Sequence, residues 1–250
     1  MIKPLIIAHR GASFEAPENT IVSIEKAIGL GVDFIEFDVR LSSGGEPFLF
    51  HDETTWRTTS CKEKIYLSDL TTAVIRSLDA GAWFGAEYDG HRVPSLEEVL
   101  AIDRGPVGLM IEIKEERVDP RAIAEAVCRA IEKRPFREEE GPLLVGSFSA
   151  AILKEIHRIT PLLPLIAIVE ETKELAGFEP LPIHYVAVDA EHITQEIIQE
   201  LQDRQLTVWT YTVDDTQEAV GLWEKGVVGI ITNNPRKIAT HFDSLSTHSE

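Results

Sequence analysis

The sequence predicts an α/β protein folded as a TIM-type (β/α)8 barrel, and three observations lead to that prediction. Short apolar runs rich in Ile, Val, Leu and Phe alternate with longer amphipathic segments, the pattern of buried parallel strands joined by helices. Eight of these runs can be parallel strands, the number that such a barrel needs. The length of 250 residues is typical of the fold, so we expect one barrel domain over residues 1–250.

The elements follow one another in a regular order along the chain. Apolar runs predict strands at 5–8, 33–39, 47–51, 107–114, 143–148, 164–169, 184–188, 206–211 and 228–232. Amphipathic segments predict helices at 20–30, 120–133, 150–159, 194–204 and 216–225. Ser95 with Glu98 and Asp215 with Glu218 have the spacing of capping boxes, and Gly31 stands where a helix-ending glycine belongs.

Nine apolar runs are one more than the barrel needs, and the run 47–51 is expected to be a hairpin arm instead of a barrel strand. Only seven residues separate it from the preceding strand, whereas a parallel crossover needs about a dozen or more. An antiparallel return through the turn Ser-Ser-Gly-Gly at 42–45 fits this spacing. If the turn centres between Gly44 and Gly45, Asp38 lies opposite His51 and the two side chains share a face.

Two further segments depart from the barrel rhythm. Residues 53–94 show no clear crossover helix and contain the stretch DAGAWFGAEYDGH. Loops of this length in compact domains are usually functional or carry their own structure, so we expect a small insertion after the second strand and its hairpin. The polar tail 243–250 is expected to be frayed.

Composition excludes several classes of function. The formal net charge of −18 repels nucleic acid and anionic membranes, but it allows a small phosphate substrate bound by local cations or a metal. No run approaches the roughly 18 apolar residues of a membrane span, and no signal peptide is visible. Cys61 and Cys128 lack metal-like spacing. We expect a cytoplasmic protein with no stable membrane insertion, and a homo-oligomer stays open.

Charged side chains stand at four strand ends where a buried strand should be apolar. They are His9-Arg10, Glu36-x-Asp38, His51-Asp52 and Glu112-x-Lys114. The two-residue period of a strand puts both members of each E-x-D or E-x-K pair on one face. Each pair comes late in its strand, which in a TIM barrel is the end that carries catalytic residues. Asp189 and Glu191 also follow a strand, but we interpret them as solvated side chains.

Three of these strand-end residues are candidate metal ligands. Glu36, Asp38 and Glu112 would repel one another at one barrel mouth unless a cation lay between them. Their oxygen atoms suit Mg²⁺ or Ca²⁺, and the lack of a His or Cys cluster argues against zinc. The sequence therefore predicts one divalent cation at the mouth.

The remaining strand-end residues suit a phosphodiester. Arg10 and Lys114 can bind phosphate oxygens, and Arg can do so with two parallel hydrogen bonds. His9 and His51 titrate near neutral pH and can act as general acid and base. A metal, two cationic anchors and two imidazoles together indicate phosphodiester cleavage.

The residues quoted above belong to an ordered set of motifs that resembles the glycerophosphodiester phosphodiesterases. The set comprises AHRGASFEAPENT (8–20), GVDFIEFDV (31–39), FHDETTWRTT (50–59), LDAGAWFG (78–85), VPSLEEVL (93–100), IEIK (111–114), YTVDD (211–215) and GIITNNP (229–235). The resemblance implies a TIM barrel with a small insertion and hydrolysis of deacylated phospholipids to glycerol 3-phosphate and choline, ethanolamine or glycerol. It also implies the metal, acid–base and phosphate roles already assigned.

The sequence departs from the family pattern in three places. The hairpin turn has Gly-Gly where Asp-Gly is common. Tyr211 keeps the aromatic residue of its block, and Trp209 shares its strand face, so either could form a wall of the glycerol site. Asp214 replaces Asn, and Asn233 replaces Asp. None of these departures is expected to touch the metal or acid–base residues.

Some aspects of the reaction stay open at this stage. We favour His9 as base and His51 as acid; the attacking oxygen is that of water or the substrate's own 2-hydroxyl, which would form a cyclic phosphate. A lysophospholipase D or a sphingomyelinase D-like enzyme on the same barrel is the nearest alternative. The many charged and small polar residues of 53–94 disfavour it. A non-catalytic phosphate-binding barrel is disfavoured because the predicted catalytic and metal residues are all present.

Overall fold

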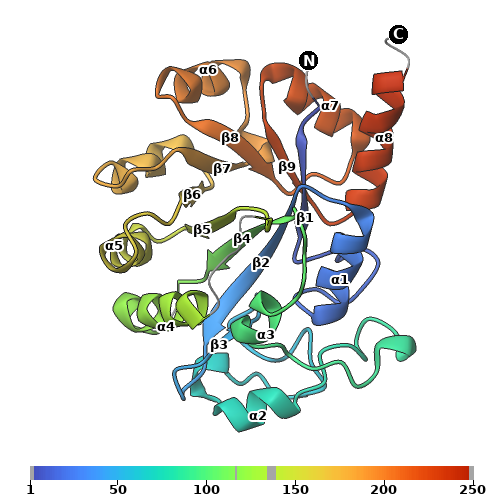
Figure 1. Cartoon of the computed structure of the whole chain (residues 1–250), viewed down its shortest axis with the longest axis vertical. Coiled ribbons are helices and arrows are strands. Elements are labelled where there is room, and N and C mark those ends of the chain that lie inside the picture. The colour runs from blue at the N-terminus through green and yellow to red at the C-terminus, as the bar shows by residue number, and fades with distance from the viewer. Residues whose placement is uncertain (1–2, 116, 134–138, 248–250) are drawn as a thin grey trace.

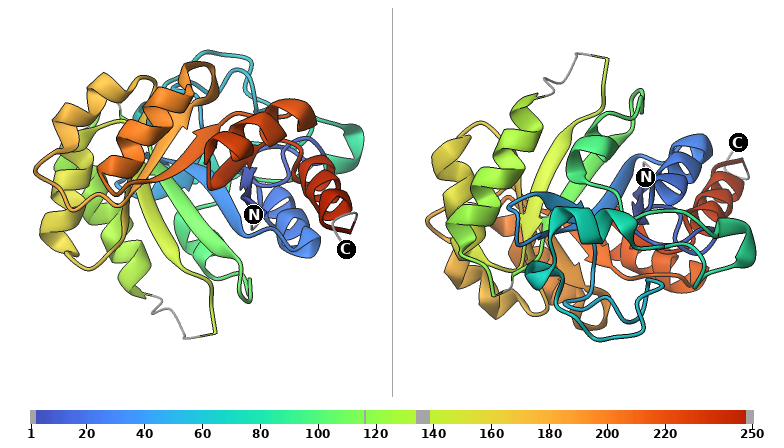
Figure 2. Two further views of the ribbon diagram at one scale, coloured as in Figure 1. Left: turned by 90° about the horizontal axis from the view of Figure 1, so that it is seen from above. Right: turned by 90° about the horizontal axis from the view of Figure 1, so that it is seen from below.

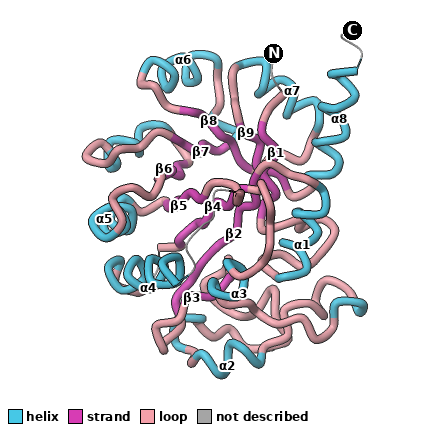
Figure 3. The backbone as a smooth tube through the Cα atoms, in the orientation of Figure 1, coloured by secondary structure: helices cyan, strands magenta, loops and turns pink. Residues whose placement is uncertain are grey.

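A closed barrel of eight parallel strands forms the centre of the computed structural model, which describes residues 3–115, 117–133 and 139–247 (Figures 1 and 3). Its strands are β1 (Leu5–His9), β2 (Phe34–Leu41), β4 (Gly108–Ile113), β5 (Leu143–Ser147), β6 (Leu165–Val169), β7 (Tyr185–Asp189), β8 (Thr207–Tyr211) and β9 (Gly229–Thr232). β1 pairs with both β2 and β9, which closes the ring. The prediction of a TIM barrel is confirmed.

The short strand β3 (Pro47–Leu49) pairs antiparallel with β2, as the short connection predicts. It occupies the edge of β2 that lies beyond the end of β1. β1 pairs with β2 only as far as Glu36, whereas β3 pairs from Val39 onward. The hairpin therefore extends one side of the barrel past its rim.

The predicted register of this hairpin is wrong by one residue, since Asp38 lies opposite Phe50 rather than His51. The Phe50 N–H donates to the Asp38 carbonyl at 3.0 Å. The reason is the loop, which has three residues, 43–45, closed by a hydrogen bond from Ser42 N–H to the Glu46 carbonyl. Gly45 takes the left-handed conformation (φ 77°) that such a loop requires.

Helices cover the outside of the barrel. They are α1 (Ile21–Leu30), α2 (Thr72–Ser77), α3 (Leu96–Leu100), α4 (Pro120–Lys133), α5 (Ala150–Ile159), α6 (Gln195–Asp203), α7 (Thr216–Lys225) and α8 (Pro235–Thr247). The five predicted helices are present, and Ser95 makes the expected capping box with Glu98. A 3-10 helix, η3 (Thr172–Phe178), follows β6 in place of an α-helix. No helix in the described ranges has both the length and the apolar character needed to cross a bilayer.

The chain end differs from the prediction of a frayed tail at 243–250, because helix α8 continues to Thr247. The Phe242 ring packs on Trp223 with centroids 5.5 Å apart, and Asp243 forms an ion pair with Lys3 at 2.8 Å. These contacts hold the helix against α7 and the start of the chain. Residues 248–250 lie outside the described residues.

The insertion 53–94 has a small hydrophobic core of its own. It is mostly loop around α2 and the 3-10 turns η1 (Leu67–Asp69) and η2 (Ala86–Tyr88), and it lies below the barrel in Figure 1 and nearest the viewer in the right panel of Figure 2. Its buried cluster consists of Phe48, Phe50, Leu67, Ile75, Leu78, Ala80 and Val93. Two of these side chains come from the hairpin, so the hairpin joins the insertion to the barrel.

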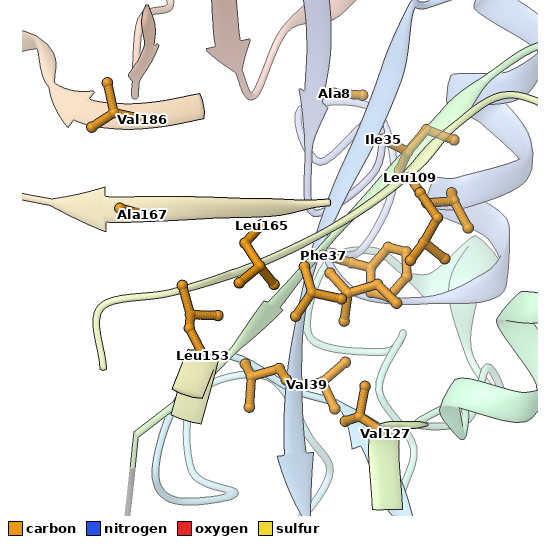
Figure 4. Packing of buried hydrophobic residues seen from close by; sticks show 14 of the residues in the cluster. Ala8, Ile35, Phe37, Val39, Leu109, Val127, Leu153, Leu165, Ala167 and Val186 are labelled. Atoms are coloured by element: carbon orange, nitrogen blue, oxygen red, sulfur yellow. The ribbon is translucent and has the colours of Figure 1, made fainter. Parts of the chain in front are cut away.

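Alternation along the strands separates the helix-facing core from the barrel interior. In β2, Ile35, Phe37 and Val39 point outward into the layer shared with the helices. Figure 4 shows Val127 of α4 in this same layer. Phe34 points inward and packs edge-to-face on Trp209 at 5.0 Å. This aromatic pair fills the barrel interior toward the N-terminal ends of the strands. The interior toward the C-terminal ends is the part left for polar side chains.

Candidate active site

The inward positions above the aromatic pair bring the predicted site residues together. A cavity of about 310 Å³ opens there. Its lining includes His9, Arg10, Glu36, His51, Glu112 and Lys114. Asp38 is fully buried. Its ion pair with Lys114, at 2.9 Å, places it beside these residues. Of the nine predicted site residues, only Trp209 lies clear of this mouth.

Glu36, Asp38 and Glu112 form a buried carboxylate cluster. One oxygen atom from each lies within 4.8 Å of the others. Burial, with the charges of Asp38 and Glu112, raises the pKa of Glu36 well above its usual range. Burial likewise raises the pKa of Glu112, whereas Lys114 and Arg10 outweigh burial and lower that of Asp38.

One oxygen of this cluster shows that the site suits a cation. Glu36 Oε1 is buried and has no hydrogen-bond partner in the described part of the chain. An unpartnered buried acceptor is costly unless a ligand satisfies it. Together with the oxygens of Asp38 and Glu112 it makes a set of hard donors that suits Mg²⁺ or Ca²⁺.

Arg10 and Lys114 bridge the carboxylate cluster to the cavity. Arg10 Nε lies 3.2 Å from Asp38 Oδ2, and Lys114 also pairs with Glu112. Arg10 has a left-handed backbone (φ 57°), and its N–H donates to Glu36 Oε2 at 2.9 Å. The conformation thus turns the chain so that backbone and side chain of one residue both face the cluster.

His9 is fixed by Asn233, one of the positions at which the sequence departs from the family pattern. Asn233 Nδ2 donates to Asp214 at 2.7 Å, which leaves Oδ1 to accept from the Nδ1–H of His9 at 2.7 Å. The Nε2 atom of His9 lies 3.9 Å from Oε2 of Glu36. Burial and the charge of Arg10 lower the pKa of His9 to about 4. The expectation that the departures at 214 and 233 do not touch this residue is therefore wrong.

His51 sits at the rim, where the chain leaves β3. Its Nδ1–H donates to Asp52 at 2.7 Å, and its carbonyl accepts from Arg40 Nε at 2.7 Å. Burial opposes ionisation of Asp52, but the hydrogen bonds from His51 and Arg57 hold the pKa of this carboxyl well below its usual range. A carboxylate that stays ionised can orient the imidazole.

Arg57 links the two halves of the site through a chain of ion pairs. From the insertion it donates to Asp52 at 2.8 and 2.7 Å and to Glu18 at 2.7 and 2.8 Å. Glu18 in turn accepts from Arg10 at 2.8 Å. His51 at the rim and Arg10 in the cavity are thereby connected through the Arg57 guanidinium.

Several of these supporting residues could have been singled out from the sequence. Asn19 holds Asp38 by donating from Nδ2 at 2.8 Å and accepting its N–H at 3.1 Å, in a left-handed conformation (φ 56°). Its signal was an Asn directly before the helix, a position favoured by such side chains. Arg40 carried the same signal as the predicted residues, a charge within a strand, and Asp52 was noted beside His51 but given no role.

Tyr211 lines the cavity, but Trp209 does not, which corrects one of the two alternatives for a wall of the site. Both point inward from β8, as the two-residue period requires. One step of two residues is about 6–7 Å along the strand, so Trp209 lies a layer deeper, fully buried against Phe34. Gly229 makes room there, since a Cβ at this position would lie 2.6 Å from the indole.

Comparison with known proteins agrees with this geometry. A model of the glycerophosphoryl diester phosphodiesterase family matches residues 9–237. The chain is 32% identical over 243 residues to a glycerophosphodiester phosphodiesterase of Caldanaerobacter subterraneus subsp. tengcongensis, covering 95% of this chain and 97% of that protein. It is 31% identical to the glycerophosphodiester phosphodiesterase of Bacillus subtilis, over 92% of this chain and 84% of that one.

A solved structure extends the likeness from sequence to shape. An Oleispira antarctica phosphodiesterase in complex with the product sn-glycerol-3-phosphate superposes with a TM-score of 0.90 and 27% identity. The match covers 96% of this chain and 97% of that one. The chain belongs to the glycerophosphoryl diester phosphodiesterase family.

Proposed function

We propose that this protein hydrolyses glycerophosphodiesters to glycerol 3-phosphate and an alcohol by metal-dependent acid–base catalysis. The carboxylate cluster with its unpartnered Glu36 oxygen, set between two imidazoles and two cations, is the observation that carries the proposal. Membership of the family supports the substrate class. A cavity of about 310 Å³ suits a small diester such as glycerophosphocholine or glycerophosphoethanolamine.

Glu36, Asp38 and Glu112 would hold the cation, Mg²⁺ or Ca²⁺. When bound, the ion would polarise a phosphate oxygen as a Lewis acid. Its charge would also offset the mutual repulsion that raises the pKa of Glu36. The three carboxylates would then stay ionised together at neutral pH.

Arg10 and Lys114 would bind the phosphate on the cavity side of this cluster. Asp38 holds both side chains in place, at 3.2 and 2.9 Å. Burial disfavours the charged form of Lys114, but Asp38 and Glu112 raise its pKa above the usual range, so it remains a cation. Two fixed cations would stabilise the negative charge that grows on the phosphorus oxygens during attack.

His9 is the better base and His51 the better acid. Because its pKa is about 4, His9 is neutral at pH 7, and its Nδ1 proton is committed to Asn233. Nε2 is therefore free to accept a proton from the attacking oxygen, whether of water or of the substrate's 2-hydroxyl. The Asp52 carboxylate orients the imidazole of His51, whose Nε2 would deliver a proton to the leaving alkoxide.

The test is release of glycerol 3-phosphate from glycerophosphocholine, measured with a coupled dehydrogenase. We expect activity that EDTA abolishes and that Mg²⁺ or Ca²⁺ restores. Full activity in EDTA would overturn the metal assignment, and no release with either ion would overturn the function. Lysophosphatidylcholine, assayed in parallel, should be a poor substrate. The cytoplasmic location stays a prediction from the sequence.

A further inference from the structure

The wall of the cavity opposite the carboxylate cluster has a different chemistry. In the ring of eight strands β7 lies across from β2, so its inward side chains face those of Glu36 and Asp38. The lining residues contributed by β6, β7 and β8 and by the segment after β5 are largely apolar, and they include Phe148, Ile168, Ala187 and Tyr211. Asp189 is the one carboxylate on this wall among the described lining residues.

Asp189 reaches the cavity because it continues the inward row of β7. Val186 and Val188 point outward into the helix-facing core, whereas Ala187 and Asp189 alternate with them and line the cavity. Oδ1 accepts from the Glu191 N–H at 2.9 Å. Oδ2 has no hydrogen-bond or ion-pair partner within the described ranges, so half of this carboxylate is available to a ligand. The interpretation of Asp189 as a merely solvated strand end is incomplete.

Two aromatic rings lie on the same wall as this carboxylate. Tyr211 is the neighbour of Asp189 in the strand register, and its ring meets that of Phe148 edge-on with centroids 6.0 Å apart. The Tyr211 hydroxyl already donates to the Val169 carbonyl at 2.9 Å, so the ring offers its aromatic surface rather than a polar group. Phe148 is 40% exposed. Aromatic faces with an adjacent carboxylate are the chemistry that recognises ammonium groups.

The phosphate anchor leads directly to these rings. Lys114 Nζ lies 5.9 Å from the centroid of Phe148, so a phosphate held by Lys114 would lie near that ring. A two-carbon chain from an ester oxygen of this phosphate would run along Phe148 and Tyr211 toward Asp189. Among the described lining residues, the Lys and Arg side chains come from the ends of β1 and β4, and none stands on the Asp189 wall.

We infer that Asp189, with Phe148 and Tyr211, forms a subsite for the cationic alcohol part of the substrate, an ammonium or quaternary ammonium group two carbons from the phosphate. The inference rests on the proposed function and adds a preference within it. Diesters of choline and ethanolamine gain a countercharge and two aromatic faces in this subsite. Diesters of uncharged alcohols such as glycerol gain neither.

The test compares three substrates that share glycerol phosphate and differ in the alcohol. Asp189→Asn keeps the shape and the acceptor for Glu191 N–H but removes the charge. We expect kcat/KM for glycerophosphocholine and glycerophosphoethanolamine to fall about tenfold, mainly through KM, because a partly exposed charge contact of this kind is modest. The value for glycerophosphoglycerol should change less than twofold. Glu191→Gln, on the exposed neighbour outside the cavity, should leave all three unchanged.

Two results would overturn the subsite. An equal loss on all three diesters would place Asp189 on the shared glycerol phosphate, and no change on any would show that it contacts no substrate. If wild-type protein released no glycerol 3-phosphate from any diester, the proposed function itself would fail, which is a distinguishable outcome.

A measurement on the wild-type protein keeps the test valid if Asp189→Asn does not fold. Tetramethylammonium chloride should inhibit glycerophosphoglycerol hydrolysis competitively, whereas sodium chloride at equal ionic strength should not. Equal effects of the two salts would contradict the subsite.

Discussion

Glu36 and Asp79 are both buried carboxylates, one in the barrel mouth and one in the insertion, and they differ in how their oxygens are satisfied. Glu36 keeps one oxygen without a partner, and burial beside other carboxylates raises its pKa. Asp79 accepts backbone N–H groups from Gly81 and Ala82 at 2.8 Å and from Gly90 at 2.5 Å. Burial opposes this charge, but these hydrogen bonds lower its pKa to about 2.

The contrast separates a carboxylate that serves a ligand from one that serves the fold. A satisfied carboxylate stabilises the loop that surrounds it, because three donors that would otherwise be orphaned are used. An unsatisfied carboxylate lowers the free energy of unfolding, and a bound cation removes this cost. Burial alone therefore does not identify function; the count of hydrogen-bond partners does.

The largest effect should come from removing the unsatisfied charge. Glu36→Gln should lower kcat/KM for glycerophosphocholine by about a thousandfold or more, since a metal contributes several kcal/mol to such a reaction. In EDTA its thermal midpoint should equal or exceed that of the wild type, because the buried charge is gone. Calorimetric titration with Mg²⁺ or Ca²⁺ should show weakened binding. Glu46→Gln, outside the cavity, is the control. If Glu36→Gln stayed active but lost stability, Glu36 would serve the fold rather than a ligand.

The next effect concerns the imidazoles beside the unsatisfied cluster. His51→Ala should lower the rate on glycerophosphocholine by about a hundredfold to ten-thousandfold, the usual contribution of a general acid. The loss should be much smaller for the p-nitrophenyl diester of glycerol phosphate, whose leaving group needs no proton. His9→Ala should lose activity on both substrates. The opposite pattern for the two variants would exchange the roles of acid and base.

A smaller loss of activity should follow from breaking the ion pairs between the insertion and the barrel mouth. Arg57 of the insertion contacts the mouth through its ion pairs with Asp52 and Glu18. Arg57→Ala should lower kcat roughly tenfold with little change in KM, because the imidazole of His51 loses its fixed orientation while the phosphate anchors remain. Arg76→Ala removes a comparable insertion arginine that pairs with Glu46 at 2.5 Å and should keep full activity. Equal losses in both variants would point to general destabilisation.

The smallest effect on catalysis is expected at the satisfied carboxylate. Asp79→Asn should leave kcat nearly unchanged but lower the free energy of unfolding at pH 7 by roughly 2 kcal/mol. Because the folded pKa is below the usual value of 3.8, this stabilisation is complete above about pH 4 and disappears as the pH falls through about 2. Urea unfolding at pH 7 and pH 3 should show the gap to wild type narrowing. Glu63→Gln, exposed in the insertion, should show no gap at either pH.

The barrel and most of the site could be predicted because strands impose a strict period of two. The period puts Glu36 and Asp38 on one face, and it places them late in the strand where the barrel opens. The same rule failed for Trp209, since it states which face a side chain occupies but not how deep the layer lies. The hairpin register depended on a three-residue loop that Gly-Gly alone does not specify. Asn233 needed a partner 224 residues away, and nothing local announces such a contact.

The separate core of the insertion has a consequence for how the protein opens. Its buried cluster is distinct from the core between strands and helices, and its ties to the mouth include the β2–β3 pairing and the Arg57 ion pairs. Segments with their own small core exchange their amide hydrogens through local opening more readily than the elements they sit on. Such an opening would release the Asp52 and Arg57 contacts that orient His51 while the eight strands stay closed. Local opening of the insertion would therefore lower activity while the barrel remained folded.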